Sequence, residues 1–209
     1  MTALKFSIIS IVVIAIAYNG VYFKKLDEVK ASRAVKDFNP TQYASQFWNG
    51  KLMPHLDKAI DITQLTALLS TDTSKAFDDY SHALGIGNLR YFLVKGRGMI
   101  ESVNEDDIVV SLPAGKHKQT VKVATEYIFG NAVRDATGLI DINDFNNTMD
   151  FNNVSAELNK IIREQVLPSF TSAVKKGSAI SFVGALELNK EHVNLERLEI
   201  IPVTVDLEK

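Results

Sequence analysis

The stretch from Tyr91 to Val103 reads YFLVKGRGMIESV, and this stretch decides the fold. It is a long run of strand-forming residues with two glycines, Gly96 and Gly98, near its middle. Glycine inside a strand is typical of a bend, a bulge or the close approach of another backbone. We therefore expect one long strand here that bends sharply at its glycines.

Two further strands are expected after it. Residues 108–112 read IVVSL and follow a polar turn at residues 104–107. From residue 121 to 129, every second side chain is a strand former, which predicts a third strand with one buried face. The expected buried face consists of Val121, Val123, Thr125, Tyr127 and Phe129.

The remaining pattern predicts a helix and then two more strands. Apolar residues recur at three- and four-residue intervals from Val154 to Phe170, which is typical of an amphipathic helix, and Gly177 ends it. A fourth strand is expected around residues 180–188 and a fifth around 201–207. The alternation of the fifth strand slips near Pro202, which indicates a bulge or an edge position.

Three strands, a helix and two strands are the element order of an OB-type barrel, a five-stranded barrel with a helix between its third and fourth strands. The predicted class is therefore α+β, and a generic α+β sheet is the alternative. We expect residues 89–209 to form the OB-like β-barrel domain. Residues 26–88 are expected to form a helical region, in which Asn39 before Pro40 and Asp61 before Gln64 are signals for helix starts.

The N-terminal residues 1–25 contain the uncharged run FSIISIVVIAIA at residues 6–17. One interpretation is an uncleaved signal anchor, a single transmembrane helix of about 20 residues. A second is a cleavable signal peptide with Ala15-Ile16-Ala17 as its cleavage site. We favour the anchor, and a buried core helix is the third and least favoured interpretation.

Composition excludes several classes of function. The net charge is -2 at pH 7, which lacks the basic footprint of a nucleic-acid-binding protein. The absence of cysteine excludes disulfides, thiolate catalysis and lipid attachment through a cysteine thiol. The four histidines are scattered, and no nucleophile elbow or phosphate-binding loop is present. We therefore expect no metal, no cofactor and no enzymatic activity.

The connection from residue 130 to 153 holds the candidate binding residues. Arg134-Asp135 is the most informative pair, because a fixed guanidinium offers planar donors to a carboxylate, a sugar or a partner protein. The alternative, which we favour, is a structural ion pair that ties the connection to the barrel. Asp144 and Asn147 complete the candidate set. They lie in a polar stretch that is similar to a calcium-binding loop. Phe145 stands where such a loop has a ligand, and Asn146 stands where it needs a glycine for the turn, so a calcium site is not expected.

Several short motifs together resemble a bacterial family of predicted periplasmic lipoproteins of unknown function. The motifs are Lys25-Leu26-Asp27-Glu28, Phe47-Trp48 with Pro54, Phe92 to Gly98, Val133 to Gly138, Asn143 to Asn147, and Ser181 to Ala185. The resemblance implies an exported, membrane-tethered protein with an OB-like core, often encoded beside ribose-type sugar ABC importers. It assigns no catalytic residue. Family members carry a lipid-modified cysteine before the Lys-Leu-Asp-Glu motif, where this chain has Asn19-Gly20-Val21-Tyr22.

The leading functional hypothesis is a non-enzymatic accessory protein. Its N-terminal helix would hold it in the bacterial inner membrane, with the soluble domain in the periplasm. There it would assist sugar uptake by binding the ABC permease, the solute-binding protein or a sugar. The alternative hypothesis is an envelope carbohydrate hydrolase or lyase that uses loop carboxylates.

Overall fold

The computed structural model describes residues 38–85, 87–113 and 119–208. The expected signal anchor, residues 1–25, lies outside the described residues. Within the described ranges, no helix combines the length and the apolar character needed to cross a bilayer. Contacts group Asn39–Lys209 into one compact unit, so the expected helical region and barrel domain share this unit from Asn39 onward.

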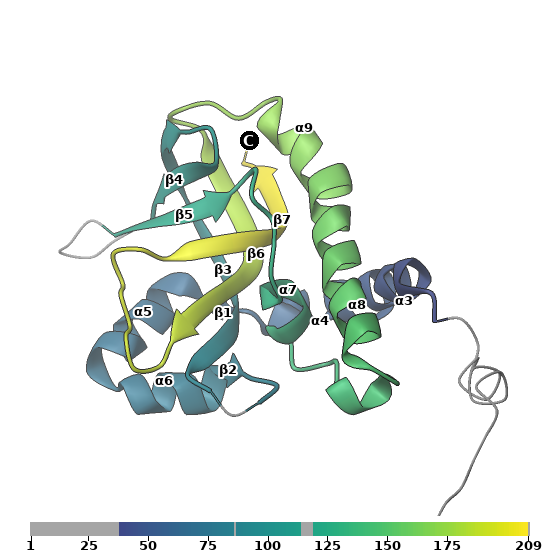
Figure 1. Ribbon diagram of the computed structural model, residues 1–209. Coiled ribbons are helices and arrows are strands. Elements are labelled where there is room, and N and C mark those ends of the chain that lie inside the picture. The colour runs from purple at the N-terminus through teal and green to yellow at the C-terminus, as the bar shows by residue number, and fades with distance from the viewer. Residues whose placement is uncertain (1–37, 86, 114–118, 209) are drawn as a thin grey trace, which may run out of the picture. The chain divides into compact units, whose positions relative to one another are not determined.

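Five strands close into a barrel (Figure 1), in the order predicted for an OB-type fold. Their bounds are β3 (Leu89–Val103), β4 (Asp107–Ser111), β5 (Thr120–Ala124), β6 (Ala179–Asn189) and β7 (Glu199–Leu207). Around the barrel the order is β3, β4, β5, β7 and β6, and β6 pairs back onto β3. All of these pairs are antiparallel except β5 with β7. The predicted barrel is therefore confirmed, with α8 between its third and fourth strands.

The long strand β3 serves two neighbours. Residues 89–99 pair with β6, and residues 99–103 pair with β4. The change of partner follows the two glycines directly. A Cβ at Gly98 would collide with the carbonyl oxygen of Ser111 on β4, so the close approach that interior glycines indicate is found here.

Strand β7 contains the predicted irregularity. Val183 of β6 pairs with Thr204, whereas the next residue, Gly184, pairs with Pro202, so Val203 is the extra residue of a bulge. The bulge explains the slip in alternation, because Pro202 and Val203 are both buried. The strand also begins earlier than the expected residue 201, at Glu199, and Ile200 is buried whereas Ile201 is only partly buried.

The third strand is shorter than predicted. It ends at Ala124, and the backbone N–H groups of Thr125 and Glu126 then donate to the carbonyl oxygen of Asp106 in the β3–β4 turn. The expectation that Tyr127 and Phe129 share a buried face with Val123 is wrong. The residue between them, Ile128, is fully buried instead.

Short helices and two-residue strands precede the barrel strands. They are α3 (Pro40–Phe47), the π-helical η1 (Trp48–Leu52), α4 (Met53–His55), η2 (Leu56–Lys58), β1 (Ile60–Asp61), α5 (Ile62–Thr71), α6 (Thr73–Tyr80) and β2 (Ser81–His82). Both predicted caps are present, because Asn39 accepts from the Gln42 N–H and Asp61 accepts from the N–H groups of Thr63 and Gln64. Strands β1 and β2 pair with β3, which extends the barrel sheet.

The predicted long helix is divided into α8 (Thr148–Ile161), the π-helical η4 (Ile162–Val166) and α9 (Leu167–Thr171). It runs alongside the barrel, and the single turn α7 (Ala132–Asp135) lies between the barrel and α8 (Figure 1). Val154, Leu158 and Ile162 point into the core from this helix, as their spacing predicts. The short η3 (Ile142–Asp144) completes the connection.

Candidate functional site

The connection between β5 and α8 begins with two exposed aromatic side chains. Tyr127 is 61% exposed and Phe129 is 66% exposed, and their rings stack with centroids 6.3 Å apart. We call Tyr127 and Phe129 the aromatic pair. Two adjacent exposed rings form an apolar patch, and exposed apolar patches can mark a surface that binds a ligand or a partner.

The backbone beneath the aromatic pair is held by one face of the long helix. Arg163 donates a 2.6 Å hydrogen bond to the carbonyl oxygen of Ile128, and Asn159 donates one of 2.9 Å to that of Gly130. Ser155 donates to the Asn131 side chain at 3.0 Å. These three donors are spaced four residues apart, so they lie along one helix face. The aromatic pair is therefore presented on a fixed backbone.

A groove lies beside the β3–β4 turn, close to the segment that carries the aromatic pair. Its volume is about 450 Å³, and it separates that turn from α9. Apolar side chains form part of its wall, including Val103, which is half exposed. Carboxylates of Glu105 and Glu126 and the guanidinium of Arg163 supply its charge. The remaining lining residues are Asn104, Ile108, Thr125, Leu167, Pro168, Thr171 and Val174.

The Arg134-Asp135 pair lies inside the protein. Arg134 is 3% exposed and Asp135 is 5% exposed, and two hydrogen bonds of 2.6 and 2.9 Å join the guanidinium to the carboxylate. Arg134 also donates to the carbonyl oxygen of Phe151 at 3.2 Å, and its Cζ lies 3.4 Å from the centroid of the Phe151 ring. These contacts tie α7 to α8. The pair is internal to the fold, but its further contacts join the connection to the helix rather than to the barrel.

Burial changes the ionisation of groups around this pair. Burial raises the pKa of Asp135, and the hydrogen bonds and charge of Arg134 oppose that effect. The pKa of Tyr91 rises to about 12, first because the phenol is buried and then because Glu187 and Asp135 lie close to it. Burial, helped by the charge of His55, lowers the pKa of His82. The charge of Asp135 therefore lies close enough to Tyr91 to affect the ionisation of its phenol.

A cavity of about 340 Å³ opens beside Asp135. Its other polar walls come from His82, Asp141 and Asn143. The His82 ring packs against Gly138, where a Cβ would lie 2.5 Å from the ring Nδ1, and Gly138 has a φ of +65°. Glycine is thus required at residue 138 both by the backbone and by the histidine ring.

The other two predicted site residues lie elsewhere in the connection. Asn147 is the N-cap of α8: it accepts from the Asp150 N–H and donates to the Asp150 carboxylate, both at 2.8 Å. Asp144 is exposed in η3, near enough to Tyr43 to contribute to the raised pKa of that phenol, after burial. Within the described part of the chain, no hydrogen bond or ion pair joins Asp144 or Asn147 to Arg134 or Asp135. The four residues are not one cluster.

Sequence reasoning missed the aromatic pair and the three donors beneath it. Tyr127 and Phe129 fit the alternation of the preceding strand, so nothing in the pattern marks the point where the strand ends. The donors had a signal: Ser155, Asn159 and Arg163 recur at intervals of four inside an amphipathic helix. Among residues 38–85, 87–113 and 119–208, no group of three acidic or histidine side chains is arranged to hold a metal ion.

Comparisons with known proteins agree with this architecture. A family model described as "Predicted periplasmic lipoprotein (DUF2291)" matches residues 11–206. A crystal structure of an OB-fold protein from Thermotoga maritima is 28% identical in sequence and superposes with a TM-score of 0.72. The match covers 83% of this chain and 100% of the Thermotoga maritima chain. The search of curated proteins gave no match.

Proposed function

We propose a function from the premise that the chain belongs to the DUF2291 family of predicted periplasmic lipoproteins. It acts in the bacterial periplasm as a tethered, non-enzymatic binding protein. The soluble unit positions a docking surface close to the inner membrane, and that surface recruits a partner protein of a sugar ABC uptake system.

The tether in this proposal is the apolar N-terminal stretch. A lipoprotein is anchored through an acylated cysteine, and this chain has no cysteine. The uncharged run at residues 6–17 belongs to a stretch from Leu4 to Phe23, which has about the 20 residues that span a bilayer. A single transmembrane helix would thus replace the lipid.

The aromatic pair is the observation that supports a docking surface. Two large rings are held in solvent by a backbone that Arg163 and Asn159 fasten to the helix, so they lose little conformational entropy on binding. Carboxylates of Glu105 and Glu126 border the groove near them. The charge and the apolar surface together fit a polypeptide segment with apolar side chains flanked by lysine or arginine.

The permease or the solute-binding protein of the uptake system is the partner we propose. Asp144 and Asn147 are exposed but lie at or before the start of α8, about 20 Å or more along the helix from Arg163, so they are not part of the proposed contact. Arg134 and Asp135 are buried and would act only by holding the connection in place. A hydrolase or lyase has less support. Both oxygens of Asp135 accept from Arg134, which leaves this carboxylate poorly placed for acid–base chemistry.

Affinity purification tests the proposal. The full-length, C-terminally tagged protein is isolated from detergent-solubilised membranes, and co-purifying proteins are identified by mass spectrometry. We expect a sugar permease or its solute-binding protein, and we expect the double variant Tyr127→Ser/Phe129→Ser to lose it.

Met149→Ser is the matched control, because Met149 is 70% exposed and precedes Arg163 by fourteen residues, roughly 20 Å along a helix. Loss of the partner in the control as well, or retention in the double variant, would exclude the aromatic pair as the docking surface. Recovery of the protein alone would contradict the uptake partnership.

A further inference from the structure

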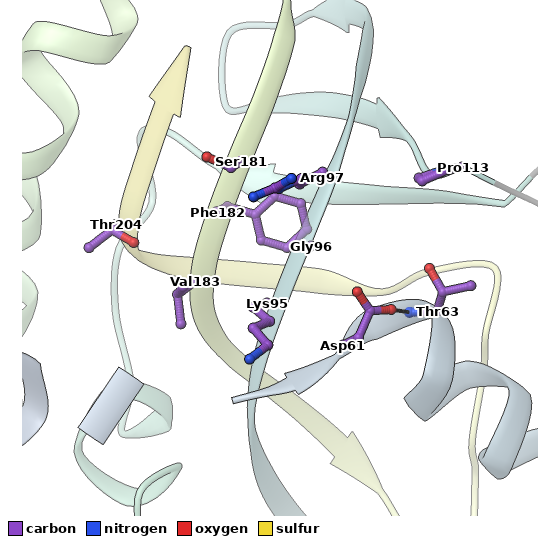
Figure 2. Close-up of a pocket in the computed structure, with 10 residues that line it drawn as sticks. All are labelled: Asp61, Thr63, Lys95, Gly96, Arg97, Pro113, Ser181, Phe182, Val183 and Thr204. Atoms are coloured by element: carbon purple, nitrogen blue, oxygen red, sulfur yellow. Dashed lines mark hydrogen bonds between the residues drawn. The ribbon is translucent and has the colours of Figure 1, made fainter. Parts of the chain in front are cut away.

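A further pocket lies on the outer face of the barrel, away from the connection discussed above. Its volume is about 530 Å³. Figure 2 shows Lys95 and Arg97 on one stretch of β3, Ser181 and Val183 on β6, and Thr204 on β7. Asp61 and Thr63, at the start of α5, form another wall. We call this cavity the barrel-face pocket.

Packing explains the glycines of the Lys95-Gly96-Arg97-Gly98 motif but not its cations. A Cβ at Gly96 would lie 2.7 Å from the Phe182 ring and 2.8 Å from Ile62, and Gly98 lies under the backbone of β4. Side chains alternate along a strand, so Lys95 and Arg97 both project outward, two residues apart on the same face. Two positively charged side chains therefore border one pocket of a chain whose net charge is -2.

The cations are weakly committed to other groups. Lys95 makes one long hydrogen bond of 3.3 Å to the carbonyl oxygen of Asp57. Arg97 reaches Glu208 at 3.2 Å through Nε, but its side chain is 77% exposed, and ion pairs this exposed contribute little. The remaining guanidinium donors are free to bind a planar anion.

Three hydroxyl side chains also line the pocket. Those of Thr63, Ser181 and Thr204 make no hydrogen bond within the described part of the chain. Asp61 is partly committed, because its Oδ1 caps α5 by accepting from Thr63 and Gln64, but its carboxylate remains a wall of the pocket. The pocket thus offers cationic donors on one side and neutral donors and an acceptor on the others.

We propose that the barrel-face pocket binds a small anion that carries hydroxyl groups, a sugar acid or a sugar phosphate. Lys95 and Arg97 bind the carboxylate or phosphate, and Thr63, Ser181, Thr204 and Asp61 contact the hydroxyls. This site is independent of the aromatic pair, so either proposal can fail without the other.

Isothermal titration calorimetry on the full-length protein in detergent tests the site. The probes are D-glucuronate, D-ribose 5-phosphate, inorganic phosphate and neutral D-ribose. We expect the hydroxylated anions to bind at least about tenfold more tightly than D-ribose and inorganic phosphate. Their affinity should fall as the salt concentration rises. The stronger of D-glucuronate and D-ribose 5-phosphate identifies the preferred anion.

Variants locate the binding. Arg97→Gln and Lys95→Gln should each lower the affinity for the preferred anion by about tenfold. Arg197→Gln, on the exposed β6–β7 loop, should leave that affinity unchanged. Unchanged melting temperatures confirm that the variants are folded. The proposal would be overturned if D-ribose or inorganic phosphate bound as tightly as the hydroxylated anions. It would also be overturned if both variants bound the preferred anion as tightly as the native protein, or if no probe bound.

Discussion

The guanidinium of Arg163 donates a 2.6 Å hydrogen bond to the carbonyl oxygen of Ile128. The side chain of Ile128 is fully buried, whereas the rings on either side of it in the sequence are exposed. Ile128 fills the core while its neighbours Tyr127 and Phe129 face solvent. The guanidinium of Arg163 also lies 5.9 Å from the Phe129 ring centroid. One side chain from the helix therefore fixes both the path of the connection and the orientation of the surface that we propose for docking.

Replacement of Arg163 should loosen that segment. We expect Arg163→Ala to accelerate amide hydrogen exchange in residues 127–131 by about tenfold, because a hydrogen bond from a charged donor is worth about 1.5 to 3 kcal/mol. Lys160→Ala, an exposed change on the same helix, is the control. Exchange that stays unchanged in Arg163→Ala would mean that Ile128 alone anchors the segment.

Removal of the buried guanidinium should destabilise the whole unit. Arg134→Ala leaves the Asp135 carboxylate buried without its partner, so we expect a loss of about 3 to 5 kcal/mol in the free energy of unfolding. Urea denaturation measures this free energy. The control is Asp144→Ala at an exposed residue, and its free energy of unfolding should lie within about 0.5 kcal/mol of the native value. A melting temperature within a few degrees of native, together with impaired sugar uptake, would instead assign Arg134 to docking.

Asp107 should make stability depend on pH in the acid range. Burial works to raise the pKa of Asp107, but hydrogen bonds of 2.6 Å from both Lys122 and Asn104 outweigh it and hold the pKa below 3.8. A lowered pKa stabilises the folded state above pH 3.8, and this contribution disappears as the pH falls through the folded value.

Asp107→Asn should therefore be less stable than the native protein at pH 7, with a difference that shrinks below pH 3.8. Chemical denaturation at a series of pH values measures this difference. A gap that is constant from neutral to strongly acidic pH would show that the carboxylate charge is not responsible.

The packing of Gly96 predicts a steric effect. Gly96→Ala forces Phe182 or Ile62 to move, and overpacking of this kind costs about 1 to 3 kcal/mol. Gly50→Ala is the matched control, because a Cβ there meets nothing within 4 Å and alanine favours helical backbone. Thermal melts of both variants distinguish a steric cost from a general intolerance of alanine.

The proposed tether predicts where the protein fractionates. We expect the full-length protein to remain with the membrane after carbonate washing and to keep residues 1–17 in mass spectrometry. A mature chain that begins after Ala17 and is released freely from the periplasm would show that the stretch is a cleaved signal peptide.

Local patterns in the sequence determined much of the barrel. The glycines of β3, the caps at Asn39 and Asp61, the apolar stripe from Val154 to Phe170 and the slip at Pro202 each reflect a contact within one element or with its nearest neighbour. Such contacts follow from backbone geometry, which repeats every two residues in a strand and every 3.6 in a helix. The order of these elements was enough to indicate the closed barrel.

Only the tertiary structure decided where the candidate sites lie. Alternation cannot show that β5 ends at Ala124, because that end depends on hydrogen bonds from the following residues to Asp106 in another turn. It cannot show either that Arg134 also donates to the carbonyl oxygen of Phe151, or that Lys95 and Thr204 border one pocket. Each of these facts depends on packing between segments far apart in the chain, and periodicity carries no information about such contacts.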